Sequence, residues 1–198
     1  FRDVSFRYPN AKEDELEHIS FKVGRGQTLA VIGATGSGKT TLVGLIPRFY
    51  DATDGEVLID GVNVKDYTFD ALYDRLGYVT QKAVLFAGTV QDNVFFGESA
   101  VPETDEVLSD ALSLSQAAEF VGKYPEGAEH PIAQLGRNVS GGQKQRLSIA
   151  RALARKPEIL VFDDSFSALD YRTDAALREG LAKELPDTTK VIVAQRIS

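Results

Sequence analysis

The stretch TLAVIGATGSGKTTL, Thr28 to Leu42, decides the fold, because an apolar strand pattern runs into a glycine-rich loop and then into a helix pattern. Residues 33–40 fit the pattern G-x-x-x-x-G-K-[ST], in which backbone N–H groups of the loop surround phosphate oxygens. We expect Gly33, Gly36 and Gly38 to take positive φ angles, and the following helix to add the positive end of its dipole. A glycine-rich turn that binds nothing is the alternative, but the flanking strand and helix favour a phosphate site.

Two other apolar runs match the strand that precedes the loop. EILVFD (158–163) and KVIVA (190–194), like TLAVIG (28–33), are almost continuously apolar and rich in β-branched residues. Such runs are typical of parallel strands that are covered on both faces. They predict a parallel α/β core.

The first third of the chain predicts an antiparallel layer. Residues 4–8 and 19–23 place Val, Phe, Tyr and Ile at alternate positions, which is the period-2 pattern of half-buried strands. Residues 57–64 favour a hairpin that turns at Asp60-Gly61.

The middle of the chain predicts helices. Between Thr104 and Val121, apolar side chains recur at near-helical spacing with no matching strand pattern. They are Val107, Leu108, Ala111, Leu112, Ala118 and Phe120. We therefore predict that residues 83–155 are mainly helical.

The composition excludes several classes of protein. A net charge of -7 over 198 residues argues against a nucleic-acid binder, which usually carries a basic stripe. The absence of Cys excludes disulfides and thiolate metal sites, and no apolar run approaches the roughly 18 residues of a membrane helix. The chain starts without Met and stops just after an apolar strand, so we expect both ends to be boundaries of a piece of something longer.

Two adjacent carboxylates complete the predicted phosphate site. Lys39 is expected to reach the β- and γ-phosphates of a nucleotide, and Thr40 to ligate Mg²⁺. Asp163 ends an apolar strand, where a P-loop NTPase places the acid that holds Mg²⁺. Asp164 follows at the position of a base or water-orienting group, and strand alternation points it away from Asp163. A capping or turn aspartate is the alternative for Asp163, and a surface carboxylate is the alternative for Asp164.

The segment NVSGGQKQRLSIARALARK (138–156) predicts a helix with an anion-binding start. Ser140 and Gln143 form the S-x-x-Q pattern of a capping box, while Leu147, Ala150 and Ala154 repeat on one face. A helix N-terminus that carries Ser and two Gly can receive an anion. Taken alone, a well-capped amphipathic helix is the simpler interpretation.

Together, these segments resemble the nucleotide-binding domain of an ATP-binding cassette (ABC) transporter. The loop at 33–40, VSGGQ at 139–143, the strand that ends in Asp163 and SALD at 167–170 occur in the order and spacing of that family. The resemblance covers nearly the whole chain, and LIPRFYDATDGEVLIDG (45–61) is similar to the exporter branch.

The resemblance implies an α/β P-loop NTPase fold of the RecA-like type with an antiparallel β layer and an inserted helical subdomain. Residues 1–82 and 156–198 would form the ATP-binding core, and residues 83–155 the signature subdomain. Tyr8 would stack on adenine, and Gln81 would be the Q-loop residue. A plain strand aromatic and a plain loop residue are the alternatives.

The implied contacts with ATP and Mg²⁺ come from these motifs. The ATP contacts would be Tyr8, Gly33, Ala34, Thr35, Gly36, Ser37, Gly38, Lys39, Thr40, Thr41 and Gln81. The Mg²⁺ contacts would be Thr40, Gln81 and Asp163.

The resemblance also implies partners. Two cassettes would stack head to tail, with each ATP between the P-loop of one and the signature helix of the other. Val139, Ser140, Gly141, Gly142 and Gln143 would then contact the ATP of a second nucleotide-binding domain. Transmembrane domains would precede Phe1, which places the chain at the cytoplasmic face of the membrane.

The chain departs from the family at two positions of the same ATP site. Active members carry Glu directly after the strand Asp, where this chain has Asp164, and His near the end of the last strand, where it has Gln195. Losing one methylene moves a carboxylate by roughly 1–1.5 Å, and a misplacement of about 1 Å can cost on the order of 100-fold in rate. Gln195 can donate a hydrogen bond but has no titratable ring.

We therefore expect ATP binding to survive and hydrolysis to fall, with Asp164, Gln195 and Lys39 as the catalytic set. This pattern resembles the degenerate-site half of a heterodimeric ABC exporter, whose intact signature serves the partner. The alternatives are a homodimeric exporter with two equal, slow sites, and a regulatory clamp that binds ATP without useful hydrolysis. A soluble ABC protein of DNA repair or translation is disfavoured by the acidic charge and by VLFAGTVQDNV (84–94).

Overall fold

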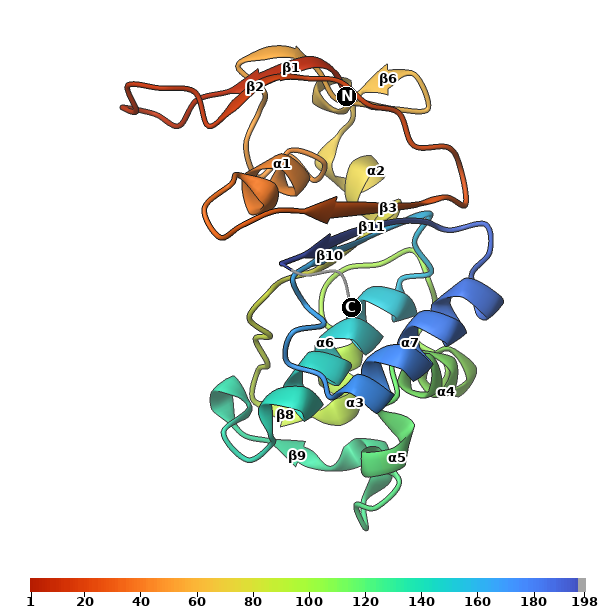
Figure 1. Cartoon of the computed structure of the whole chain (residues 1–198). Helices are drawn as coiled ribbons and strands as arrows, with labels where there is room; N and C mark the ends of the chain where they lie inside the picture. The colour runs from red at the N-terminus through yellow and green to blue at the C-terminus, as the bar shows by residue number, and fades with distance from the viewer. Residues whose placement is uncertain (196–198) are drawn as a thin grey trace.

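A four-stranded parallel sheet forms the centre of the chain, of which the computed structural model describes residues 1–195 (Figure 1). The strand order is β3-β11-β10-β7, and every neighbouring pair is parallel. The bounds are Thr28–Ile32 for β3, Leu76–Val79 for β7, Ile159–Asp163 for β10 and Thr189–Ala194 for β11. The predicted parallel α/β core is confirmed, and the carboxyl ends of all four strands meet at one edge of the sheet.

The central strands have both faces covered, but the outer strand β3 does not. Leu160, Val161 and Phe162 of β10 are fully buried. On β3, Ile32 is 47% exposed, and Thr28 and Ala30 on the same face are also exposed. The prediction of two covered faces is therefore wrong for β3, because the elements within residues 1–195 leave one face of this edge strand open to solvent.

An antiparallel layer lies on one side of the parallel sheet, with the order β2-β1-β4 (Figure 1). Its bounds are Arg2–Phe6 for β1, Leu16–Ile19 for β2 and Asp54–Glu56 for β4. The predicted layer is confirmed, although its first two strands are shorter or shifted relative to the alternating pattern.

The shifts have local causes. Strand β1 ends at Phe6, because the N–H of Arg7 donates to the Thr53 hydroxyl at 3.0 Å rather than to a strand neighbour, and Tyr8 is left outside. Phe21 lies beyond β2, and its ring stacks on that of Phe1 with centroids 4.5 Å apart.

The predicted hairpin is confirmed at residues 57–64. Strands β5 (Leu58–Ile59) and β6 (Val62–Asn63) pair across Asp60 and Gly61, whose φ angles are 51° and 79°. Two successive positive φ angles are the requirement of a type I′ turn, which Asp-Gly meets.

Helices lie on both sides of the parallel sheet (Figure 1). On the side of the antiparallel layer are α1 (Lys39–Gly44), η1 (Val64–Asp66) and α2 (Phe69–Asp74). The remaining helices are α3 (Val90–Val94), α4 (Asp105–Leu114), α5 (Ala118–Val121), η2 (Gly127–Glu129), η3 (Gln134–Gly136), α6 (Gly141–Ala154) and α7 (Tyr171–Glu184). Strands β8 (Gly88–Thr89) and β9 (Pro131–Ile132) pair as a short antiparallel ribbon in the same part of the chain.

The segment with near-helical spacing, residues 104–121, forms two helices, α4 and α5. The break lies at Gln116, whose φ of 62° is left-handed and cannot continue an α-helix. Because the break shifts the phase of the pattern, Ala117 is fully buried and Ala118 is exposed.

The parallel sheet separates two apolar cores. Leu160 and Phe162 pack into the core formed with α4, α6 and α7, whereas Val161 between them packs toward α1 and the antiparallel layer. Strand β10 is thus fixed from both faces, which holds the acids at its carboxyl end in place.

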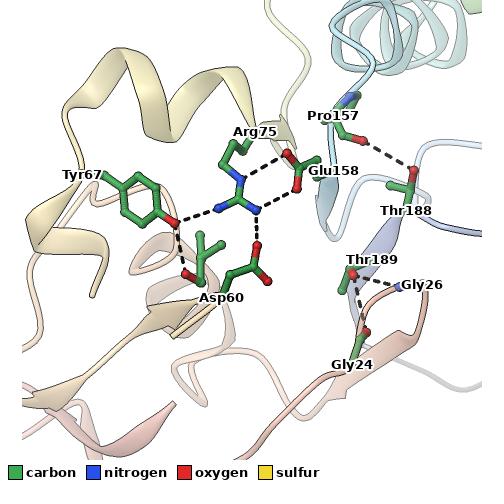
Figure 2. A network of polar contacts seen from close by, with 10 residues as sticks. Gly24, Gly26, Asp60, Tyr67, Arg75, Pro157, Glu158, Thr188 and Thr189 are labelled. Carbon is green, nitrogen blue, oxygen red and sulfur yellow. Dashed lines mark hydrogen bonds and ion pairs between the residues drawn. The ribbon is translucent and has the colours of Figure 1, made fainter. Parts of the chain in front are cut away.

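At the opposite edge of the sheet, Arg75 links three elements through its guanidinium (Figure 2). It contacts both carboxylate oxygens of Glu158, at 3.3 and 2.7 Å, and also Asp60 at the hairpin turn. Its Nη1 donates at 2.7 Å to the hydroxyl of Tyr67, which in turn donates to the carbonyl of Ile59 at 3.1 Å. The hairpin is therefore held against the starts of β7 and β10 by one side chain.

We predict that Arg75→Met lowers the free energy of unfolding by about 2 kcal/mol, because it removes charge-assisted hydrogen bonds and leaves two carboxylates facing each other. The matched control is Arg2→Met, whose ion pair with Glu56 is exposed at 71% and 45% and is worth about 0.5 kcal/mol or less. Urea unfolding of both variants measures the difference, and equal losses would contradict the proposed role of Arg75.

Candidate functional site

The loop between β3 and α1 has the shape of a phosphate cradle. Gly36 and Gly38 have φ angles of 80° and 81°, as predicted, so their N–H groups can turn inward. Gly33 does not have a positive φ, and this part of the prediction is wrong. A Cβ at this position would lie 2.6 Å from the hydroxyl oxygen of Ser37, so the Ser37 side chain would have to move to accommodate it.

Lys39 crosses the mouth of this loop. Its ammonium donates to the carbonyls of Gly33 and Ala34 at 2.7 and 2.6 Å, and to the Ser37 hydroxyl at 3.3 Å. Ala34 and Thr35 at the tip of the loop are exposed. An ammonium held only by neutral oxygens is positioned to exchange them for the stronger acceptors of a phosphate group.

Asp163 is buried at 4% exposure and receives two hydroxyl donors. Thr40, from α1, donates to Oδ1 at 2.9 Å, and Tyr78, from β7, donates to Oδ2 at 3.3 Å. Burial raises the pKa of the Asp163 carboxyl, and these two hydrogen bonds oppose the shift. Burial, with a contribution from Asp163, also raises the pKa of the Tyr78 phenol well above its usual range, so the phenol stays a donor.

Asp164 lies beyond the end of β10 and has a different set of partners. Gln81 and Gln195 both donate to its Oδ2, at 3.1 and 2.9 Å. The residue is left-handed, with a φ of 49°, and its N–H donates to the carbonyl of Val193 at 3.2 Å. The turn, rather than strand alternation, therefore sets the direction of this carboxylate.

Tyr8 packs beside the start of α1. Its hydroxyl lies 2.7 Å from that of Thr41, and its ring makes edge contacts with Phe6 and Tyr50, with centroids 4.8 and 5.1 Å apart. The structure thus brings residues 33–41, Tyr8, Gln81, the two acids and Gln195 into one connected region.

The predicted signature residues form a separate region at the start of α6. Ser140 accepts from the N–H of Gln143 at 3.2 Å, and the side chain of Gln143 accepts from the N–H of Ser140 at 2.9 Å. This capping box is confirmed. Val139 is buried, whereas a Cβ on Gly141 would meet no atom within 4 Å. Within residues 1–195, no hydrogen bond joins residues 139–143 to the phosphate loop.

This geometry agrees with what comparison with known proteins finds. The family model described as ABC transporter matches residues 16–167. The chain belongs to the ABC transporter family.

Similar proteins place the chain within the exporter type of ABC nucleotide-binding domain. It is 44% identical over 198 residues to the ABC transporter ATP-binding protein YfiB of Bacillus subtilis (strain 168), a match that covers 100% of the chain and 34% of that protein. It is 42% identical over 200 residues to Multidrug resistance protein 4 of Entamoeba histolytica, covering 100% of the chain and 15% of that protein. The solved structure of a bacterial Atm1-family ABC exporter with ATP bound matches at a TM-score of 0.90 and 34% identity, covering 98% of this chain and 34% of that one. The chain thus spans about a third of the length of YfiB.

The ABC fold seen here confirms the predicted α/β P-loop architecture with its antiparallel layer and helices. None of the helices within residues 1–195 has the length and apolar character needed to cross a bilayer. The same residues hold no cluster of three or more His, Asp or Glu side chains arranged for a metal ion.

Tyr78, which holds Asp163 and also lines a surface hollow, was not among the residues predicted from the sequence. A hollow of about 700 Å³ is bordered by Phe49, Tyr73, Tyr78 and Arg155, and a neighbouring one of about 320 Å³ by Tyr78, Phe96 and Arg155. We call the two together the aromatic groove. The signal was a tyrosine in the otherwise apolar strand LGYV, but only the pairing of β7 with β10 places it near Asp163.

We predict that Ser140→Ala lowers the free energy of unfolding of this ABC domain by about 1 kcal/mol, because it removes half of the capping box. Thr104→Ala, which removes the cap of α4, is the matched control and should cost a similar amount. Thermal unfolding of the two variants measures both losses, and an unchanged Ser140→Ala variant would show that the cap contributes nothing.

Proposed function

We propose that this chain is the energy-coupling domain of an ABC exporter, and that it forms the degenerate-site half of a heterodimer. One observation carries the proposal: a complete phosphate loop and a complete capped signature stand beside an acid, Asp164, that is one methylene shorter than the usual Glu. Binding is retained at such a site, while hydrolysis is slow.

The binding half of the proposal draws on residues 33–41 and Tyr8. Lys39 contacts the β- and γ-phosphates, and the loop N–H groups contact the remaining phosphate oxygens. The half-buried ring of Tyr8 beside α1 supports its role against adenine.

Mg²⁺ fits the donor set of this site. The ion prefers hard oxygen ligands, and Thr40 and Asp163 offer a hydroxyl and a carboxylate from two elements whose oxygens already lie 2.9 Å apart. In this proposal Thr40 and Asp163 hold the ion, with Gln81 as a further contact. When bound, Mg²⁺ neutralises charge on the β- and γ-phosphates.

Hydrolysis requires a group that aligns water with the γ-phosphorus. Asp164 is that group by position, but its carboxylate ends short, and two amides, from Gln81 and Gln195, donate to one of its oxygens. Gln195 can donate to a phosphate oxygen, but its amide has no titratable group that could act as an acid or a base. Both departures lower the rate without removing a contact needed for binding.

The partners follow from the exposed surfaces. The signature at 139–143 is proposed to contact the ATP of a second, non-identical nucleotide-binding domain. In the aromatic groove, Phe49 and Phe96 are 52% and 48% exposed, and such a patch fits an apolar helix end of a transmembrane domain on the cytoplasmic side of the membrane.

We further propose that residues 83–155 act as the signature subdomain, and that residues 1–82 with 156–198 act as the core. No nucleic acid partner is proposed.

We predict that the Asp164→Glu/Gln195→His double variant hydrolyses ATP at least about 100-fold faster than the unmodified chain, because it restores the reach of the acid. ATPase turnover of the full-length protein measures this, alone and with its cognate partner. ATP affinity should stay within a factor of two or three, as roughly 0.5 kcal/mol of change allows.

The degenerate-site assignment is wrong if the unmodified protein alone turns over as fast as the partnered form. A native complex with two identical cassettes would favour the homodimeric alternative with two equal, slow sites.

A second candidate function is a regulatory clamp, which the two amides on Asp164 favour. Ser140→Ala separates the two functions, since the exporter proposal expects the partner's transport-linked ATPase to fall by about 10-fold or more through loss of one charge-assisted contact. The Thr104→Ala variant, which loses a comparable cap away from the signature, should leave that ATPase unchanged. A passive clamp predicts little change in both.

A further inference from the structure

Among the described residues 1–195, Thr40 and Tyr78 donate to Asp163, and of these two only Tyr78 also lines the aromatic groove. At its hydroxyl end it donates to Oδ2 of Asp163 at 3.3 Å. At its ring it makes an edge contact with Phe49, with centroids 5.0 Å apart and planes at 67°. The same ring lines both hollows of the aromatic groove. A single rigid side chain therefore spans from the groove surface to the acid.

Asp163 and Phe49, the residues at the two ends of the Tyr78 side chain, differ in exposure. Asp163 is buried and its second oxygen, Oδ1, is already held by Thr40 at 2.9 Å. With both oxygens held, the carboxylate cannot rotate about its Cβ–Cγ bond without breaking a hydrogen bond. Phe49 is half exposed, so another surface can pack directly on its ring.

The backbone around Tyr78 limits how it can respond. Strand β7 pairs with β10 from Ile159 to Phe162, with Tyr78 opposite Val161. Since that pairing fixes the Tyr78 backbone, packing against the ring would act on the side chain rather than on the strand.

We propose that Tyr78 is a positioning residue that couples packing in the aromatic groove to the orientation of Asp163. The inference rests on the proposed function for the role of Asp163 toward Mg²⁺. When the groove is filled, Phe49 is pressed against Tyr78, and the phenol hydroxyl is held on Oδ2. When the groove is empty, this oxygen is held less firmly and the metal ligand is less well ordered.

The test is the affinity of Mn²⁺ for the full-length transporter, measured by electron paramagnetic resonance with a non-hydrolysable ATP analogue. Tyr78→Phe keeps the ring contact and removes the hydroxyl, so it should weaken Mn²⁺ binding by about 10-fold, as loss of an outer-shell hydrogen bond does. Binding of the analogue without metal should not change. Tyr73→Phe, in the same groove, is the matched control and should leave Mn²⁺ affinity unchanged.

The coupling is tested by a double-mutant cycle with Phe49→Ala. If the groove acts through Tyr78, the double variant loses no more Mn²⁺ affinity than Tyr78→Phe alone. Additive losses would overturn the link to the groove, and an unchanged Tyr78→Phe variant would overturn the positioning role. If the unmodified transporter binds no metal with the analogue, the proposed function itself is wrong, which is a distinct result.

Discussion

The end of strand β10 is the constraint on which the site depends. Asp163 is still part of the strand and therefore buried, whereas Asp164 is one residue later, in a left-handed turn that directs it elsewhere. Burial, with a smaller contribution from the neighbouring charge of Asp164, raises the pKa of the Asp163 carboxyl. The turn separates the partners of the two acids, because one faces two hydroxyls and the other faces two amides.

The parallel sheet collects the rest of the site. Gly33 follows β3 directly, Gln81 lies just after β7, Gln195 follows β11, and both acids lie at the end of β10. Because all four strands run in the same direction, four distant parts of the sequence deliver polar groups to one edge. Burial of alternate β10 side chains on both faces keeps this edge rigid.

Spacing along the chain was enough to predict the features that are local. The phosphate loop, the Asp60-Gly61 turn and the capping box of Ser140 each depend on residues a few positions apart, and their geometry agrees with the sequence. Features that depend on the strand order could not be predicted in this way. Nothing in the sequence pattern shows that β3 lies at an edge, or that a phenol from β7 reaches Asp163.

Two local features differ from what the sequence pattern alone suggests. A strand-to-helix loop rich in glycine suggests positive φ angles throughout, yet Gly33 has none, and a Cβ there would need only the Ser37 hydroxyl to move. Apolar residues recur at near-helical spacing across residues 104–121, although the left-handed backbone of Gln116 divides the helix there. Periodicity reports which side chains are apolar, and it does not report where a single residue leaves the helical region.

The separation of the two regions is compatible with the proposed degenerate-site function, in which hydrolysis falls while the signature and the phosphate loop are kept. The signature is held by its own capping box, whose two hydrogen bonds involve Ser140 and Gln143 alone, so shortening the acid at Asp164 places no strain on it. Nor does the phosphate loop depend on that acid, because Lys39 and Thr40 bond to the loop and to Asp163. In the proposed function, the departures at Asp164 and Gln195 would therefore affect hydrolysis rather than these contacts. In the proposed head-to-tail pair, the partner's ATP would still meet an unaltered signature, and the two sites would differ because of the residues at two strand ends.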